Sequence, residues 1–131
     1  MVFPKILVID ACPVNRALYR SAFSNKQYDL EYVDNLSAYR KAAQWWQPDL
    51  IFLDLHRTQA MDAHLIAKIR KVSEDHIPIV VTAPMVSDTL QQLVQSFGVD
   101  AAYSTLQGMN QISMVADRIM SGQSLLDKGR T

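Results

Sequence analysis

Runs of apolar residues alternate along this chain with stretches of helical periodicity. Residues 5–10, 49–54 and 77–82 each contain an uninterrupted apolar run, a pattern typical of strands that are buried on both faces of a parallel sheet. Residues 28–33 alternate between polar and apolar positions, which predicts a half-exposed edge strand. Residues 99–104 form a weaker run and are expected to supply the opposite edge.

Five stretches place apolar residues at helical spacing, one after each predicted strand. Pro13 suits the first turn of the first helix, Asp34 or Asn35 can cap the second, and Gly98 can end the fourth. The third helix is expected over residues 63–73. The positions expected to face the core are Val14, Ala17, Leu18 and Ala22; Leu36, Tyr39, Ala43 and Trp46; Leu65, Ile66, Ile69 and Val72; Leu90, Leu93, Val94 and Phe97; and Ile112, Val115, Ala116, Ile119 and Met120.

This alternation predicts an α/β fold, a flavodoxin-like (βα)5 single domain with helices on both faces of a parallel five-stranded sheet. The strand order 2-1-3-4-5 puts the three apolar runs in the centre and the two weaker runs at the edges. In that order the strands that end at Asp10 and Asp54 are neighbours. Their carboxylates and the hydroxyl of Thr82 should therefore meet at one edge of the sheet. The domain is expected to span residues 1–122, followed by a polar tail over 123–131.

The composition is that of one folded domain, with 49% apolar and 20% charged residues. A formal net charge of +0 argues against non-specific binding to nucleic acid or to an anionic membrane. The single cysteine, Cys12, cannot form an internal disulfide, which fits a reducing compartment. No apolar run approaches the ~18 residues of a membrane span. We therefore expect a cytoplasmic protein that binds neither nucleic acid nor membrane.

Two carboxylates at the end of neighbouring strands suit a hard cation such as Mg²⁺, which accepts one or two carboxylates together with carbonyl and water oxygens. Beside a bound phosphoryl donor, one carboxylate could attack phosphorus and become an aspartyl phosphate. That chemistry also needs a hydroxyl donor and a fixed cation to stabilise the phosphoryl oxygens. Thr82 can supply the hydroxyl, whereas no lysine or arginine directly follows the last predicted strand, where a fixed cation would be expected.

The segments Lys5–Asp10, Pro48–His56 and Ile77–Ala83, with Gly98-Val99-Asp100, resemble the receiver domain of two-component response regulators in order and spacing. The resemblance covers essentially the whole chain. It implies that Asp54 is the phosphate-accepting aspartate, Thr82 the switch hydroxyl and Asp10 the first of a pair of acidic residues. It also implies that the backbone carbonyl of His56 is a metal ligand and that the partner is a histidine kinase or another signalling protein.

Several positions depart from the family pattern. The second acidic residue of the pair is replaced by Ala11, and the lysine and proline after the last strand are replaced by Thr105 and Leu106. The aromatic switch partner corresponds to Ala102. Arg57 could reach into the site and replace the missing cation, because guanidinium pairs well with phosphate; an exposed loop arginine is the alternative.

Three hypotheses about function remain in play. The first is a receiver-like signalling module that acts through protein contacts, with phosphorylation of Asp54 weak or lost and no enzymatic activity beyond that self-modification. Losing one electrostatic stabiliser typically costs about 2.7–4 kcal/mol, so losing two could take phosphotransfer below useful levels. The second is a working phosphoacceptor that uses Mg²⁺. The third is a flavodoxin-like protein that binds a small ligand, although residues 10–16 lack a phosphate-binding loop. Under a purely structural reading, Asp54 caps a loop and Thr82 is an ordinary strand-end hydroxyl.

Residues 77–116 contain no Lys, Arg, His or Glu, although two predicted helices lie among them. A charge-poor surface with Met and aromatic residues is typical of interface cores, so we expect partner docking or a homodimer through residues 86–120. A neutral solvent-exposed face is the alternative. Trp45 lies off the inward stripe of its helix and is also expected at the surface or over the helix end. The interface candidates are Met85, Gln91, Gln95, Tyr103, Met109 and Gln111.

Overall fold

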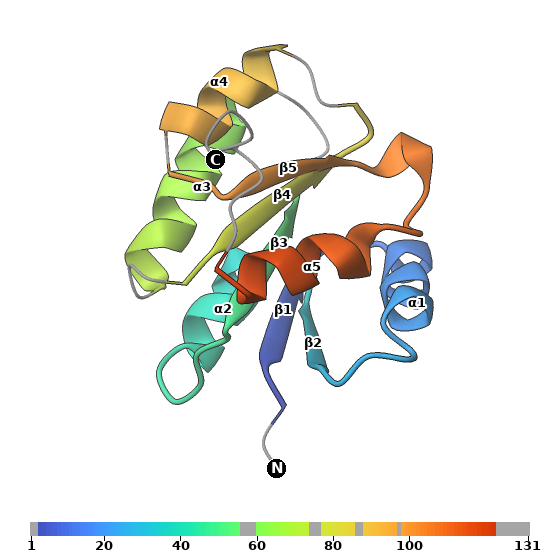
Figure 1. Ribbon diagram of the computed structural model, residues 1–131. Coiled ribbons are helices and arrows are strands. Elements are labelled where there is room, and N and C mark those ends of the chain that lie inside the picture. The colour runs from blue at the N-terminus through green and yellow to red at the C-terminus, as the bar shows by residue number, and fades with distance from the viewer. Residues whose placement is uncertain (1–2, 56–59, 74–76, 86–87, 97, 123–131) are drawn as a thin grey trace.

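The computed structural model describes residues 3–55, 60–73, 77–85, 88–96 and 98–122 (Figure 1). Five parallel strands form one sheet in the order β2-β1-β3-β4-β5, which confirms the predicted flavodoxin-like topology. The central strands are buried because both of their faces are covered by helices. The strands are β1 (Lys5–Ile9), β2 (Asp29–Val33), β3 (Leu50–Asp54), β4 (Ile79–Ala83) and β5 (Ala101–Ser104).

Helices cover both faces of the sheet, α1 and α5 on one face and α2, α3 and α4 on the other (Figure 1). The second helix begins where the side chain of Asn35 accepts a hydrogen bond from the amide of Ala38 at 2.9 Å, so Asn35 is the cap. The helices are α1 (Pro13–Ala22), α2 (Leu36–Ala42), α3 (Ala60–Val72), α4 (Asp88–Ser96) and α5 (Ile112–Met120), with a 3₁₀ turn η1 (Thr105–Gln107).

Two helix boundaries differ from the prediction. The third helix begins at Ala60, three residues before the expected start. The second ends at Ala42, although its apolar stripe was expected to continue to Trp46. Trp46 still packs against the core, from the turn that follows the helix. The side chains of Leu65, Leu93, Val94 and Phe97 and the expected tail over 123–131 lie outside the described residues.

The predicted inward face of α1 is wrong for Val14, Ala17 and Leu18, whereas Ala22 packs against the core. Val14 is 66% exposed and Leu18 is 43% exposed, whereas Tyr19 and Phe23 are buried. Tyr19 packs against Phe52 of β3 with ring centroids 5.5 Å apart, and Phe23 lies 6.2 Å from the same ring. The helix is therefore rotated so that its larger aromatic rings enter the core, because these rings bury more apolar area than Val14 and Leu18 would.

Among the described residues, no helix combines the length and the apolar character that crossing a membrane requires.

Candidate functional site

Asp54 and Thr82 face each other at the carboxyl ends of two central strands. Asp54 is the last residue of β3, and it pairs in register with Thr82 of β4. The Thr82 hydroxyl donates a hydrogen bond to Oδ1 of Asp54 at 3.0 Å. Thr82 is almost fully buried, with 1% of its surface exposed, while Asp54 is partly exposed. The Thr82 hydroxyl, which the family resemblance identifies as the switch hydroxyl, is thus hydrogen-bonded to the expected phosphate acceptor.

Asp10 directly follows β1, the strand beside β3. Ile9 pairs with Leu53, so Asp10 and Asp54 leave the sheet from neighbouring strands. Asp10 is buried, and its carboxylate oxygens accept hydrogen bonds from the loop that follows it and from the first turns of α1. Oδ1 accepts from the amide of Cys12 at 2.9 Å, and Oδ2 accepts from the side-chain amide of Asn15 at 3.0 Å. Asp10 therefore fixes the connection between β1 and α1.

A basic side chain, Arg16, lies next to this connection. Its Nε donates to the backbone carbonyl of Asp10 at 2.8 Å, and its terminal nitrogen binds the carboxylate of Asp34. The guanidinium also lies 5.7 Å from the centroid of the Tyr32 ring. Sequence reasoning did not select Arg16, because nothing in its spacing distinguishes it from an exposed helical arginine.

Tyr19 of α1 brings a phenol group to the same site, and the sequence did not predict it. Its hydroxyl lies beside the side chain of Thr82 and close enough to Asp10 and Asp54 to feel both negative charges. Burial, and then the two carboxylates, raise the pKa of Tyr19, so the phenol keeps its proton.

The end of β5 carries no basic side chain. Thr105 opens the 3₁₀ turn η1 immediately after the strand, and Leu106 is 70% exposed. Hydrogen bonds from the Leu106 amide and the Ser104 hydroxyl to the Pro84 carbonyl, at 3.2 and 2.8 Å, tie this turn to the end of β4. Ala102 pairs with Val81, one residue before Thr82.

The donor set for a metal is small. Ala11 is exposed next to Asp10, where a second acid was expected from the family pattern. No group of three or more His, Cys, Asp or Glu side chains among the described residues could hold a metal ion. His56 and Arg57, the expected carbonyl ligand and the candidate replacement cation, lie outside the described residues.

The interface candidates divide into exposed and buried residues. Met85 is 67% exposed, and Gln91, Gln95 and Gln111 are also exposed. Met109 is 7% exposed, so its selection as a surface residue was wrong. It packs into the core beside Ile112 and Ala101 because it precedes the first buried turn of α5.

Tyr103 is partly buried. Its hydroxyl donates to the Gly108 carbonyl at 2.6 Å, which ties β5 to the connection that leads into α5. Trp45, by contrast, is 76% exposed, as expected for a residue off the inward stripe.

No family model matches the sequence, and no curated protein matches it significantly. Solved structures do match its fold. A response regulator from Thermotoga maritima has a TM-score of 0.80 at 16% identity, over 92% of this chain and 99% of that one. A chemotaxis response regulator from Vibrio cholerae has a TM-score of 0.76 at 15% identity, over 90% and 99%.

The receiver domain of a sensor histidine kinase from Pseudomonas aeruginosa, with a magnesium ion coordinated in its active-site cleft, has a TM-score of 0.71 at 14% identity. It covers 92% of this chain and 99% of its own. Together with the strand order and the two carboxylates at the edge of the sheet, these matches show that the chain has the fold of the response-regulator receiver domain.

Proposed function

We propose that this chain is a receiver-like module of a two-component or phosphorelay system that acts chiefly through protein contacts, with phosphorylation of Asp54 weak or lost. The observation that carries the proposal is the site's own bonding. Asp54 and Thr82 are hydrogen-bonded to each other, and Asp10 accepts hydrogen bonds from Cys12 and from Asn15 of α1. The turn after β5 supplies Thr105 and Leu106 in place of a cation.

The chemistry that remains at the site is limited. Asp54 could attack the phosphorus of a donor, forming an oxygen–phosphorus bond while the donor's leaving group departs with its electron pair. Thr82 could turn its hydroxyl from Asp54 to a phosphoryl oxygen. Nothing placed at the end of β5 would balance the charge on the phosphoryl oxygens, and a missing stabiliser of this kind costs ~10²–10³ in rate.

The two carboxylates fit Mg²⁺ as a weak site. Asp10 and Asp54 are the residues that would hold it, and when bound it would neutralise negative charge on the phosphoryl oxygens. The amide of Cys12 and the side chain of Asn15 already use one lone pair on each Asp10 oxygen. Ala11 adds no third carboxylate. We infer that Mg²⁺ binds more weakly here than in a site with a full acidic pair.

Exposed apolar residues around the same edge support a role in protein contacts. Val14 follows the end of β1 and is 66% exposed, Met85 follows β4 and is 67% exposed, and Leu106 follows β5 and is 70% exposed. The carboxyl ends of parallel strands meet at one edge, so these residues lie toward the edge of the sheet that carries Asp54. Apolar groups gathered at one edge mark protein interaction sites. A cytoplasmic histidine kinase or another signalling protein is the proposed partner.

Beryllofluoride, a phosphoryl mimic, tests the proposal by amide NMR in the presence of Mg²⁺. We expect the amide resonances of residues around Asp54 and Thr82 to stay in place. The alternative function, a working phosphoacceptor, is favoured by the convergence of Asp54, Thr82 and Asp10. It would show as saturable shifts that depend on Mg²⁺ and vanish in Asp54→Ala.

Self-association through residues 86–120 is part of the same proposal. Gln91 and Gln95 are exposed one turn apart on α4, and Met114 of α5 is 49% exposed. We expect light scattering to show a dimer fraction that grows with concentration. The double variant Gln91→Glu/Gln95→Glu should be monomeric, because the added charges repel each other across the dimer interface. The control variant Gln27→Glu, far from α4 in sequence, should still dimerise. A wild-type protein that stays monomeric throughout would contradict this surface assignment.

A further inference from the structure

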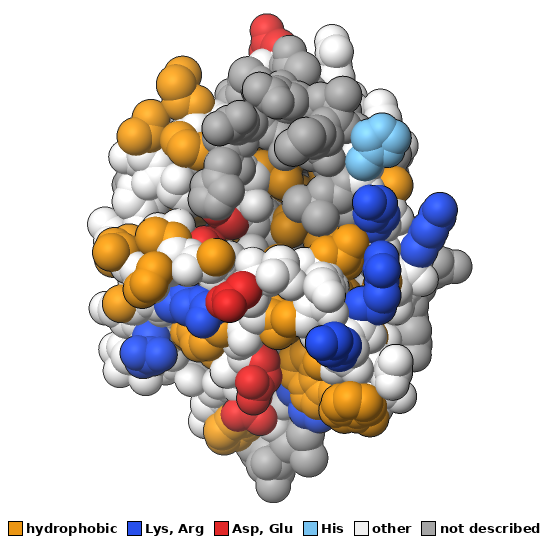
Figure 2. Space-filling view, turned by 180° about the vertical axis from the view of Figure 1, so that it is seen from behind, with side chains coloured by type: hydrophobic (Ala, Val, Ile, Leu, Met, Phe, Trp, Pro, Cys, Tyr) orange, Lys and Arg blue, Asp and Glu red, His pale blue; other side chains and the backbone are white. Residues whose placement is uncertain are grey.

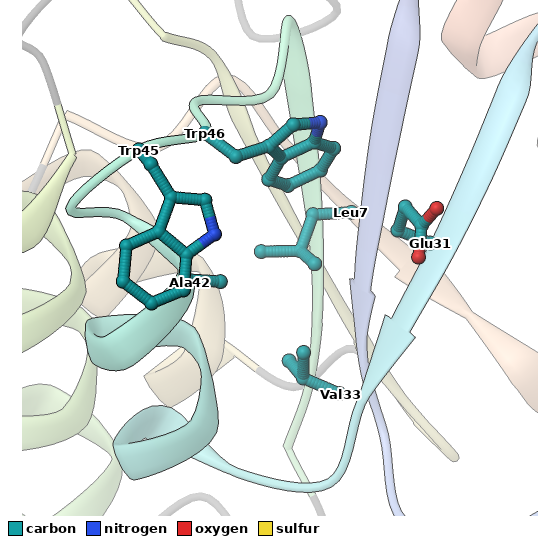
Figure 3. Close-up of a pocket in the computed structure, with 6 residues that line it drawn as sticks. All are labelled: Leu7, Glu31, Val33, Ala42, Trp45 and Trp46. Atoms are coloured by element: carbon teal, nitrogen blue, oxygen red, sulfur yellow. The ribbon is translucent and has the colours of Figure 1, made fainter.

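A cavity of about 300 Å³ lies on the side of the sheet covered by α2, away from the Asp54 site (Figure 3). This volume is at the lower end of the range for small-molecule sites. In Figure 3 the indole rings of Trp45 and Trp46 lie on one side of the cavity, and Glu31 reaches it from β2. The lining residues are Leu7, Glu31, Val33, Ala42, Trp45 and Trp46.

The early end of α2 explains the cavity. This helix has 7 residues, which at 1.5 Å per residue span roughly 10 Å, whereas the five-residue strands beneath it span roughly 17 Å. Part of the sheet face over Leu7 and Glu31 is therefore not covered by helix. The turn after Ala42 places the two tryptophans beside that gap.

The lining combines an apolar floor, two indoles and one carboxylate. Leu7 is 1% exposed and forms part of the core, whereas Trp45 is 76% exposed. Of the described residues that line the cavity, only Glu31 has an ionisable side chain. Among the described residues its carboxylate takes part in no ion pair, and neither indole N–H donates a hydrogen bond. Indole faces attract cations, and a carboxylate beside them adds to that attraction.

Charged groups of both signs lie around the cavity. The ammonium of Lys5 lies 5.8 Å from the centroid of the Trp46 ring. Lys5 pairs in register with Asp29, and its backbone amide donates to the Asp49 carboxylate at 2.7 Å. The acidic residues Asp29, Glu31 and Asp49 therefore outnumber Lys5 in this part of the sheet. Figure 2 views this side of the molecule and shows acidic, basic and apolar side chains together near its lower end.

We propose that this cavity binds a small organic cation, an alkylated ammonium group with a compact apolar body. The cation lies against the indoles and pairs with Glu31, and the apolar body covers Leu7 and Val33. The site uses none of the residues of the Asp54 cluster. A negative result for the cation site would therefore leave the receiver proposal unchanged. A negative result for the receiver proposal would likewise leave the cation site unchanged.

Choline and its neutral carbon isostere, 3,3-dimethyl-1-butanol, test the charge requirement. The chain has two tryptophans and both line the cavity, so intrinsic fluorescence and the indole NMR resonances report on this site alone. At constant ionic strength, choline is expected to shift both signals saturably. The isostere should bind about tenfold more weakly, because it lacks both the cation–π attraction and the ion pair.

Substitutions test whether the Glu31 carboxylate itself binds the cation, or whether any negative charge on β2 has the same effect. Glu31→Gln should weaken choline binding by about two- to fivefold. Trp45→Ala should weaken it by a similar factor of about two to five, followed through Trp46. Asp29→Asn is the matched control, because Asp29 lies two residues away from Glu31 on the same strand and does not line the cavity. This variant should bind choline with the affinity of the wild type.

Three outcomes would overturn the proposal: equal binding of choline and its isostere, no perturbation of either indole, or equal losses in Asp29→Asn and Glu31→Gln. Glu31 and Trp45 are exposed, so these variants are expected to keep the circular dichroism spectrum of the wild type.

Discussion

Replacing Ala11 by aspartate together with Thr105 by lysine is expected to raise the rate of Mg²⁺-dependent phosphorylation of Asp54 by at least ~10²–10³-fold. Ala11 is exposed directly after Asp10, so a carboxylate there adds an oxygen ligand at the acidic edge. Thr105 directly follows β5, which pairs with the strand that carries Thr82, so a lysine there would place its charge near the site. Intact mass spectrometry over time with acetyl phosphate measures the rate.

The matched control carries asparagine and methionine at the same two positions. These side chains approximate the size of aspartate and lysine without their charges. It should phosphorylate no faster than the wild type. If the charged pair gives no gain, or if the gain survives in Asp54→Ala, the missing charges are not what limits the site.

Truncating Tyr19 should cost the fold far more than truncating Leu18 on the same helix. Tyr19 is 1% exposed, packs on Phe52 and reaches Thr82, so Tyr19→Ala should lower the free energy of unfolding by about 3–5 kcal/mol. Leu18 is 43% exposed, and Leu18→Ala should cost less than about 1 kcal/mol. Urea denaturation of both variants measures the difference.

Tyr19→Phe separates the ring from its hydroxyl. It keeps the packing on Phe52 and removes only the polar contact of the hydroxyl with Thr82, so we expect a loss of about 1 kcal/mol. A larger loss for Leu18→Ala than for Tyr19→Ala would show that α1 packs through the face first expected from the sequence.

The strand order could be predicted because the central strands are fully buried. A strand covered on both faces must be apolar at every position, and Leu50–Leu53 and Ile79–Val81 have that pattern. Right-handed crossovers then leave few topologies. The meeting of Asp10, Asp54 and Thr82 follows from the same rule, because each lies at or just beyond the carboxyl end of its strand.

The side-chain partners at the site could not be predicted in the same way. On α1, Val14 with Leu18 and Asn15 with Tyr19 are both spaced at one helical turn, so periodicity alone does not select the inward face. The hydrogen bonds that Asp10 accepts from Cys12 and Asn15 depend on the conformation of the connection between β1 and α1, which the residue types do not fix. Met109 was misplaced because its position relative to the first turn of α5 decides its burial.

The cavity beside α2 has a similar cause. The apolar stripe of that helix continues to Trp46, but the helix ends at Ala42. Where a helix ends depends on its last hydrogen bonds and on tertiary packing, so its end is less determined by the sequence than its existence. Because α2 ends at Ala42, the indoles of Trp45 and Trp46 line a part of the sheet face that the helix does not cover.

Intact mass spectrometry of the wild-type protein after incubation with acetyl phosphate and Mg²⁺ tests the central claim most directly. The claim is that Asp10 and Asp54 share an edge of the sheet that lacks the cation needed to stabilise a phosphoryl group. It predicts little or no phosphoryl adduct, at the level seen in Asp54→Ala. A stoichiometric adduct that requires Mg²⁺ and disappears in Asp54→Ala would contradict it.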